Sequence, residues 1–140
     1  MHKRFYASGF IYHLPSQLIL LQQPQSIDAP WVLFEKEYEE TKQPEDIFQN
    51  VISKSLNIKV KNIHKIYSYT EGNLKNYSLF YATVNKLEDF PPKNGYIFRW
   101  FTFKEILKIR TTDQTKHNIV VGQRVIESTE RKERGEQTLE

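Results

Sequence analysis

The sequence predicts an α/β (α+β) fold, a three-layer α/β/α sandwich with a central mixed β-sheet. Three observations support this class. Two runs rich in apolar, aromatic and β-branched residues open the chain as a hairpin, a proline-led segment with an apolar stripe follows, and a second helical pattern closes the chain after further strands. With 140 residues, the chain is long enough for one hydrophobic core.

The chain is expected to begin with a β-hairpin. A strand is predicted over 4–13, where RFYASGFIYH combines aromatic and β-branched residues. A second strand is predicted over 18–24, because the nearly continuous apolar run LILLQQP is typical of a strand buried on both faces. The stretch 25–43 that follows shows no regular pattern, and a loop of such length is usually functional.

A helix is predicted to begin at Pro44, because proline suits the first helical turn, and Glu45 and Asp46 suit the positive end of a helix. Asn57 is expected to end it as a left-handed C-cap. The apolar stripe expected to face the sheet consists of Ile47, Phe48, Val51 and Ile52.

The second half of the chain predicts another hairpin, one more strand and two helices. Strands are expected over 58–69, 77–84 and 95–103, a short helix over 104–109, and a longer helix over 114–126. We therefore expect a single domain over 1–126. Residues 127–140 are polar and charged, and are expected to form an extension that is either a solvated helix or a frayed tail.

The composition excludes several kinds of function. The chain has no cysteine, which excludes disulfides, thiolate metal sites and cysteine nucleophiles and suits a reducing cytoplasm. No apolar run is long enough to span a membrane, and the first ten residues lack the apolar region of a signal peptide, so we expect a cytoplasmic protein. The net charge of +3 permits an anionic ligand, but no DNA- or RNA-binding signature is present.

The chain resembles a Nudix domain (MutT-like) over nearly its whole length, from Phe5 to Ile126. The resemblance rests on the order and spacing of ASGFIY, LILLQQ, Trp31, PED, SLNIKV, WFTFKEI and HNIVVGQRVI. The signature of that family is G-x5-E-x7-R-E-U-x-E-E-x-G-U, where U is a bulky apolar residue. Fitting the end of the signature to Asn57 and Ile58 assigns the other positions as follows: the opening glycine to Lys36, the first glutamate to Lys42, the Arg-Glu pair to Asn50 and Val51, the apolar position to Ile52, and the Glu-Glu pair to Lys54 and Ser55.

The Nudix box is thus degenerate in its chemical positions. Mg²⁺ requires oxygen ligands in a near-octahedral array, and carboxylates at i, i+3 and i+4 of a helix would supply them from one face. These three positions are Val51, Lys54 and Ser55. A further glutamate that the family tends to place before the tryptophan of the late strand is Ile97 here. We therefore expect a Nudix-like protein that lacks the usual catalytic glutamates and that binds, without cleaving it, a nucleotide-like or other anionic ligand, or a protein partner.

Three lysines are the candidate ligand-binding residues. Lys36, Lys42 and Lys54 all fall at signature positions that the resemblance implies lie around one site. A lysine can supply, as a point charge to a phosphate, the positive charge that a metal would have supplied, so no cofactor is expected. The competing interpretation is that they are ordinary surface lysines.

An alternative function is a metal-dependent hydrolase of nucleoside-diphosphate derivatives. It would use the carboxylates Glu37, Glu39 and Glu40 for catalysis, with Mg²⁺ or Mn²⁺ held by Glu39 and Glu40. Glu39 is the best candidate, because it matches a glutamate often present in this loop of the family. The competing interpretation is that these are solvated loop acids.

The remaining candidates are aromatic residues and histidines. Six aromatic residues could stack on a nucleobase or could be core and cross-strand pairs: Trp31, Tyr67, Tyr69, Tyr77, Phe80 and Tyr81. His13, His64 and His117 have no metal-ligand spacing and are expected to be structural or on the surface. A homodimer is compatible with the sequence.

Overall fold

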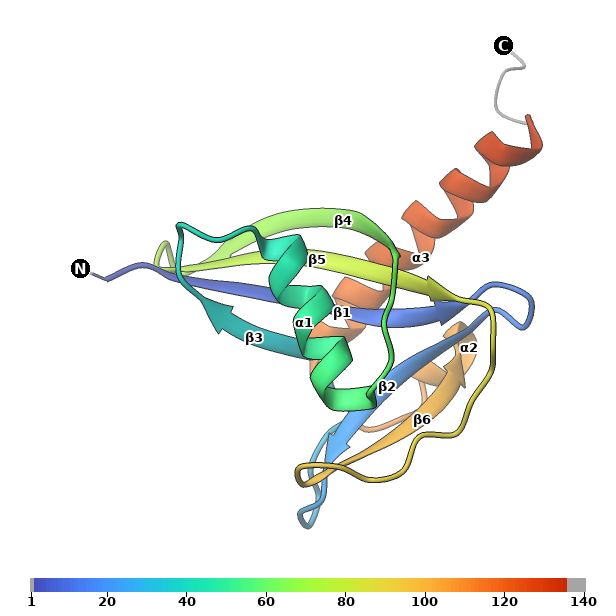
Figure 1. Cartoon of the computed structure of the whole chain (residues 1–140), viewed down its shortest axis with the longest axis horizontal. Helices are drawn as coiled ribbons and strands as arrows, with labels where there is room; N and C mark the ends of the chain where they lie inside the picture. Colours follow the sequence, from blue (N-terminus) through green and yellow to red (C-terminus); the bar gives the residue numbers. More distant parts are fainter. Residues whose placement is uncertain (1, 136–140) are drawn as a thin grey trace.

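The structure is a computed structural model that describes residues 2–135 of the chain. Its elements are, in order, β1 (Arg4–His13), β2 (Leu18–Pro24), β3 (Phe34–Tyr38), α1 (Pro44–Leu56), β4 (Asn62–Glu71), β5 (Lys75–Val84), β6 (Tyr96–Thr102), α2 (Phe103–Ile106) and α3 (Asp113–Arg134). Figure 1 shows α1 in front of the sheet and α3 behind it. The predicted α/β/α sandwich with a mixed sheet is therefore confirmed.

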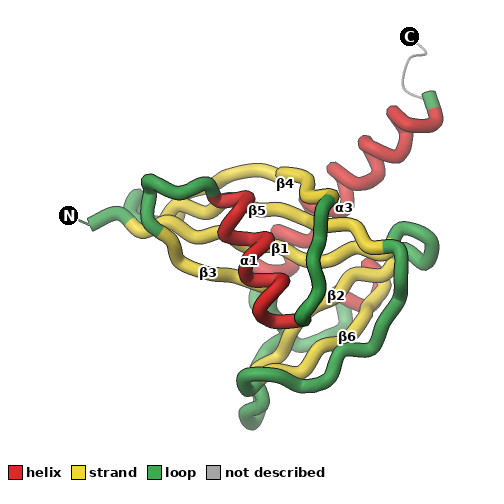
Figure 2. The backbone as a smooth tube through the Cα atoms, in the orientation of Figure 1, coloured by secondary structure: helices red, strands yellow, loops and turns green. Residues whose placement is uncertain are grey.

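The sheet forks at its central strand, β1. The strand order is β4-β5-β1-β2-β6, with β3 pairing β1 as a branch of the sheet. The first half of β1 pairs β3, from Phe5 opposite Tyr38 to Gly9 opposite Phe34, whereas its last residues, Ile11 to His13, pair β2. The pairing of β1 with β5 is parallel, and the other pairings of named strands are antiparallel. The tube view in Figure 2 shows β3 and β2 leaving β1 on diverging paths.

Each face of the sheet carries its own core. On one face, Phe48 and Ile52 of α1 are fully buried against the sheet. On the other, Ile119 and Ile126 of α3 pack on Phe10 and its neighbours. Because side chains alternate between the faces of a strand, β1, β2, β4, β5 and β6 supply both cores, whereas β3 contributes to the α1 side only.

Gly9 allows α1 to lie close to the sheet. A Cβ atom at this position would collide with the carbonyl oxygen of Phe80 on β5 and would fall 2.7 Å from the ring of Phe48 on α1. The phenyl ring of Phe48 instead stacks on that of Phe80, with ring centroids 5.7 Å apart. The close approach of helix and sheet thus depends on the missing side chain.

Several predicted boundaries are confirmed. The strands over 4–13 and 18–24 have the predicted bounds and form a hairpin, and the helix begins at Pro44. Asn57 caps the helix in the left-handed conformation, with φ 56°. The later hairpin of β4 and β5 is also present, although β4 begins four residues later than predicted, at Asn62.

The prediction of an irregular loop over 25–43 is wrong in one part, because this stretch contains β3. The sequence of β3 is FEKEY, whose three central residues are charged and exposed. Such a strand has neither a buried apolar run nor an apolar alternation, and it forms because β1 offers hydrogen-bonding partners along its edge.

The last helix continues beyond the predicted end of the domain at 126. α3 runs without a break from Asp113 to Arg134, and its last turns project past the sheet (Figure 1). The helical form of the extension is therefore observed up to Arg134, while 136–140 lie outside the described residues. In the described part of the chain, no helix is long and apolar enough to span a membrane.

Candidate ligand-binding cleft

A cleft of about 370 Å³ opens between the sheet and the first turns of α3. Its lining combines tyrosines, side-chain amides, hydroxyl groups and two carboxylates, and includes no lysine or arginine. The lining residues are Gln22, Val32, Leu33, Glu35, Tyr69, Glu71, Tyr77, Tyr96, Thr112, Gln114, Thr115 and Asn118. The cleft therefore offers many hydrogen-bonding groups and a net negative charge.

Local structure determines which side chains reach the cleft. Phe34 is buried on the α1 face of the sheet, so the alternation along β3 directs Glu35 to the α3 face. At the start of α3, the hydroxyl oxygen of Thr112 accepts a hydrogen bond of 3.1 Å from the Thr115 backbone N–H. This N-cap fixes the first turn of the helix and places Asn118 one turn further along, facing the sheet.

A ladder of stacked tyrosines forms the sheet side of the site. The ring of Tyr77 on β5 lies 4.9 Å from that of Tyr6 on β1 and 4.8 Å from that of Tyr69 on β4. Tyr67 continues the row, with its ring centroid 5.3 Å from that of Tyr69. The planes of neighbouring rings differ by 23° or less. The ladder crosses three strands and gives the cleft a rigid aromatic side.

Asn118 connects the ladder to α3. Its side-chain oxygen accepts hydrogen bonds from the hydroxyl of Tyr67 at 2.8 Å and from the amide of Gln114 at 3.0 Å. Its amide nitrogen donates to the hydroxyl of Tyr69 at 3.1 Å. Asn118 is only 3% exposed, so these bonds form in a protected environment. The second N–H of its amide makes no hydrogen bond within residues 2–135 and remains available to a ligand.

Desolvation shifts the proton affinity of the groups in the cleft. It raises the pKa of the Glu35 carboxyl group, with Glu71 adding to the effect and the nearby Ser8 hydroxyl opposing it. Desolvation, followed by the negative charges of Glu35 and Glu71, raises the pKa of Tyr77 to about 12. The pKa of Tyr69 is also raised, mainly by desolvation. All three shifts disfavour negative charge in this cleft.

Ser8 is buried next to the cleft without a hydrogen-bond partner. It is 1% exposed, and among the described residues its hydroxyl is a buried polar group left unsatisfied. Ser8 is the register partner of Glu35, so the two side chains lie on the same face of the sheet. An unpaired buried hydroxyl is unfavourable, and such groups often mark a place where a ligand or water binds.

The three predicted lysines lie outside this cleft. Lys36 is on β3 and points to the α1 face, since it follows Glu35 in the strand. Lys42 lies in the loop before α1, where its backbone N–H donates to the carbonyl oxygen of Glu39, and Lys54 lies in the last turn of α1. A helix rises 1.5 Å per residue, so Lys54 lies roughly 15 Å along the axis of α1 from Pro44, the first helical residue. All three are exposed, and none lines a pocket described here.

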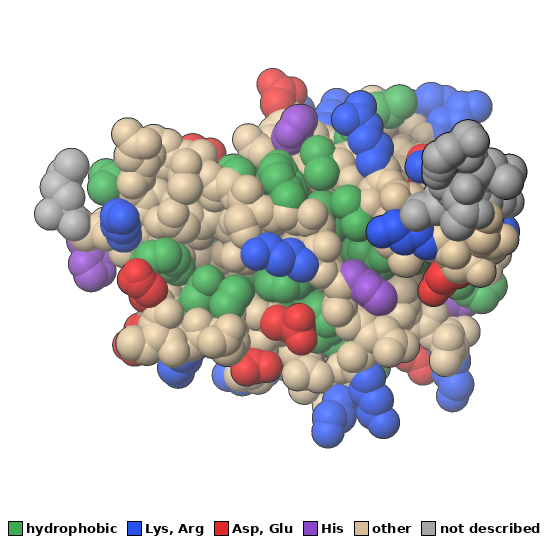
Figure 3. Space-filling model, turned by 90° about the horizontal axis from the view of Figure 1, so that it is seen from above, with side chains coloured by type: hydrophobic (Ala, Val, Ile, Leu, Met, Phe, Trp, Pro, Cys, Tyr) green, Lys and Arg blue, Asp and Glu red, His purple; other side chains and the backbone are tan. Residues whose placement is uncertain are grey.

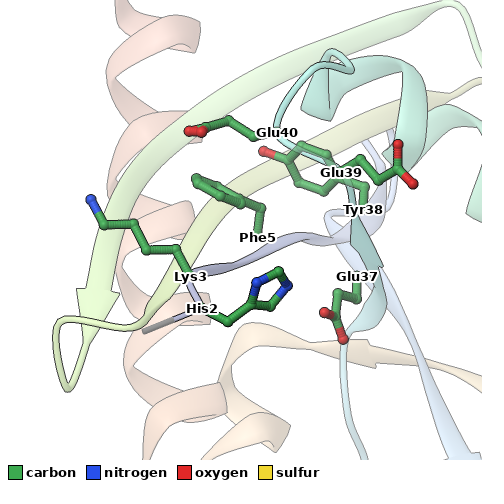
Figure 4. Close-up of a pocket in the computed structure, with 7 residues that line it drawn as sticks. All are labelled: His2, Lys3, Phe5, Glu37, Tyr38, Glu39 and Glu40. Atoms are coloured by element: carbon green, nitrogen blue, oxygen red, sulfur yellow. The ribbon is translucent and has the colours of Figure 1, made fainter.

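The three acids of the alternative prediction line a separate pocket of about 550 Å³ near the start of β1. Figure 4 shows that the carboxylates of Glu37, Glu39 and Glu40 point in different directions, with Phe5 and Tyr38 between them. Among residues 2–135, no group of three or more histidines and acids is placed to hold a metal ion. The acids thus share a pocket without converging on one point.

The α1 face that would carry a Nudix metal site bears no carboxylate at the fitted positions. Val51 and Ser55 are half-buried, with Val51 packing against the core under α1, and Lys54 is exposed. Ile97 on β6 packs against the other core. The positions fitted to the signature thus offer no carboxylate oxygen to Mg²⁺.

The aromatic candidates divide into two groups. Tyr67, Tyr69 and Tyr77 belong to the ladder, and the last two line the cleft. The other three, Trp31, Phe80 and Tyr81, are buried in the cores. His13 is structural, because its ring bonds the Ser16 hydroxyl at 2.6 Å and the carbonyl oxygen of Asn85 at 3.2 Å, whereas His64 and His117 are exposed.

Sequence reasoning missed Asn118, Glu35 and Glu71 as parts of one site. One signal was present, because Asn118 is a polar residue that precedes the apolar run Ile119 to Val121 in a helix expected to pack on the sheet. The distribution of surface charge does not mark a binding site either. On the face seen in Figure 3, basic and acidic side chains are interspersed, without a continuous basic area.

Comparison with known proteins identifies the fold. No protein-family model matches the chain, and no curated protein matches it significantly. The NUDIX domain of NrtR from Shewanella oneidensis, solved with ADP ribose, matches with a TM-score of 0.72 and 10% identity, covering 90% of each chain. An Ap4A hydrolase from C. elegans matches with a TM-score of 0.69 and 12% identity, covering 90% of this chain and 99% of its own.

A third match is the C-terminal domain of mouse MUTYH, solved in complex with human PCNA. It has a TM-score of 0.67 and 13% identity, and covers 87% of this chain and 88% of its own. At such identities the likeness concerns the fold. The chain has the Nudix fold, and the resemblance inferred from its sequence is confirmed at that level.

Proposed function

We propose that this chain is a non-catalytic Nudix-fold protein that binds a nucleotide-like small molecule in the cleft between the sheet and α3. The observation that carries this proposal is the lining of the cleft. The stacked Tyr69 and Tyr77 offer a rigid aromatic side, and the unpaired N–H of Asn118 offers a hydrogen-bond donor at a defined position. Nucleobases are recognised by this combination of aromatic contacts and directed hydrogen bonds.

The comparisons support the same class of ligand. One protein of the same fold was solved with ADP ribose, and another is a hydrolase of Ap4A. Metal-dependent catalysis of the Nudix kind requires carboxylates that the fitted positions of α1 lack, since these are Val51, Lys54 and Ser55. The likeness in fold supports a nucleotide-like ligand, and the residues at the fitted positions favour binding it without hydrolysis.

The proposed role of Lys36, Lys42 and Lys54 is to attract an anionic part of the ligand that extends outside the cleft. All three are exposed, so each can act as a point charge on a phosphate. They come from three different segments, β3, the loop before α1 and the last turn of α1, so each is expected to act individually. Lys54→Ala should therefore weaken binding of a phosphorylated ligand and leave that of the matching nucleoside unchanged.

Binding can be tested by thermal shift with adenosine, ADP and ADP ribose, each with and without Mn²⁺. We expect stabilisation of the wild-type protein that does not depend on the metal and that disappears in Asn118→Ala. Since Asn118→Ala also removes contacts of the fold, Gln114→Ala serves as a milder variant, because Gln114 is exposed and lines the same cleft. Lys104→Ala, exposed on α2, is the matched control.

Two other results would replace this proposal. Metal-dependent release of phosphate or nucleoside monophosphate, lost in Glu39→Gln, would establish the hydrolase that uses Glu37, Glu39 and Glu40. If no nucleotide or nucleoside stabilises the protein, binding of a protein partner becomes the favoured function. Light scattering would then show whether the partner is a second copy of this chain, as in the homodimer that the sequence allows.

A further inference from the structure

We infer that the cleft selects a flat, positively charged group, such as an amidinium, a guanidinium or a cationic heteroaromatic ring, and that it disfavours anions. The inference rests on the proposed function, because it concerns the same cleft and specifies the part of the ligand that enters it. Glu35, Glu71 and Tyr77 carry the argument.

The charges around the cleft are unbalanced. Glu35 and Glu71 both line it, while no lysine or arginine does. Lys75 partly compensates both acids: its charge acts on Glu35, and it lies 3.9 Å from the Glu71 carboxylate, with the side chains of Lys75 and Glu71 about half exposed. Exposed ion pairs of this kind are weak and easily exchanged. No salt bridge of 4.0 Å or less involves Glu35 within the described chain.

The neighbouring cation in the sequence cannot compensate for Glu35. Lys36 follows it in β3, and the strand alternation directs Lys36 to the opposite face of the sheet. On the α3 face, Glu35 instead lies near Glu71 and the neutral phenol of Tyr77, and the negative charges of the two carboxylates act on one another through a partly desolvated region. A cation in the cleft would relieve this repulsion, whereas an anion would increase it.

The unsatisfied groups also favour a ligand that donates hydrogen bonds. The carboxylate of Glu35 and the hydroxyl oxygen of Tyr77 line the cleft and can accept hydrogen bonds from a ligand. The buried Ser8 hydroxyl beside Glu35 has no hydrogen-bond partner among residues 2–135 and can also accept one. Planar amidinium and guanidinium groups present paired N–H donors that match a carboxylate. Aromatic rings at the same site add attraction for a cation. Charge, acceptors and aromatic lining therefore point to the same class of group.

Three isosteric probes test the sign of the charge directly. Benzamidine is cationic, benzamide neutral and benzoate anionic, while all three have the same planar shape. We expect benzamidine to bind about three- to tenfold more tightly than benzamide, and benzoate to bind most weakly. Titrations followed by ¹H–¹⁵N NMR would give the affinities, and shifts of the Asn118 side-chain amide would report that binding occurs in the cleft.

Matched variants test the cause. Glu35→Gln and Glu71→Gln keep the side-chain size and remove one charge each, and each should lower the affinity for benzamidine toward that for benzamide. Glu45→Gln removes the same charge from the first turn of α1, on the other face of the sheet, and should leave the preference unchanged. A preference for benzoate overturns the inference, as does a benzamidine preference that survives both cleft variants.

The test separates this inference from the proposed function. If adenosine binds in the cleft but the affinities of the three probes do not follow their charge, the inferred charge selection is wrong and the proposed function stands. If benzamidine is preferred but no nucleoside or nucleotide binds, the cleft selects cations and the nucleotide-like ligand is wrong. If neither binds, both are overturned.

Discussion

The side-chain amide of Asn118 donates a 3.1 Å hydrogen bond to the hydroxyl of Tyr69, which joins the beginning of α3 to β4. The same side chain accepts a bond from Tyr67 on that strand. One residue of the helix thereby holds two neighbouring rings of the tyrosine ladder. The connection is structural, and the remaining N–H of Asn118 is the one that the proposed ligand would meet.

Replacing Asn118 by leucine should destabilise the protein by about 1–3 kcal/mol, because two tyrosine hydroxyls lose their partner in a protected place. Tyr67→Phe should cost less, about 0.5–1.5 kcal/mol, since it removes one bond. In urea denaturation, the double variant should be less destabilised than the sum of the two. Additive effects would contradict the coupling described here.

Alkaline pH should destabilise the protein between pH 10 and 12. The pKa of Tyr77 is raised from 10.0 to about 12 in the folded state, mainly by desolvation, so the unfolded chain loses this proton first. The folded state binds more protons in that window, and its stability therefore falls as the pH rises through it. Tyr77→Phe should lose less stability between these pH values than the wild type.

The measurement for Tyr77 is thermal unfolding at a series of pH values, together with the absorbance of tyrosinate. Both proteins should first be compared at neutral pH, so that any loss of packing is separated from the pH effect. Tyr12, whose pKa is also raised to about 12, remains in the variant and accounts for part of the slope. An identical pH dependence of the two proteins would contradict the prediction.

Gly9→Ala should destabilise the protein by about 3 kcal/mol, because the added methyl group meets a backbone carbonyl that cannot move without disturbing the pairing of β1 with β5. Gly122→Ala on α3 offers a comparison. Its methyl group would lie 2.9 Å from the ring of Phe10, a side chain that can shift, and alanine favours the helix. Denaturation curves should therefore show a clearly smaller loss for Gly122→Ala.

Carboxylates restored on α1 should create a metal site. The triple variant Val51→Glu, Lys54→Glu and Ser55→Glu places three carboxylates at i, i+3 and i+4 of one helix. At saturating Mn²⁺ it should gain about 1–3 kcal/mol of stability over its metal-free form, with no such gain in the wild type. The same three positions changed to glutamine provide the uncharged control. If the triple-glutamate variant folds but its stability does not change with Mn²⁺, this face of the helix cannot bind a metal.

Much of the fold could be predicted because its signals are local. Pro44 and Asn57 bound α1 through backbone preferences that each residue carries by itself, and the apolar run from Leu18 to Leu21 marks a buried strand. β3 could not be predicted in this way. Its charged sequence becomes a strand through pairing with the distant Phe5 to Gly9 of β1, which no local pattern encodes.

The site was less accessible to sequence reasoning for the same physical reason. Glu35, Tyr77 and Asn118 come from three elements that only the topology of the sheet brings together. The resemblance drew attention to the lysines of the signature positions, which the structure places on the exterior. The tyrosines were recognised as candidates, because aromatic residues on strands can either stack on a nucleobase or pair across strands. Here they pair across strands, and two of them also line the cleft.

The length of α3 has a practical consequence. The helix carries Asn118 near its beginning and ends at Arg134, so roughly 24 Å of rigid helix separates the cleft from that end. Its last turns leave the body of the domain (Figure 1). A surface anchor, an affinity handle or a fluorescent reporter attached beyond Arg134 would thus stand clear of the cleft entrance, and the immobilised domain would remain open to ligands from solution.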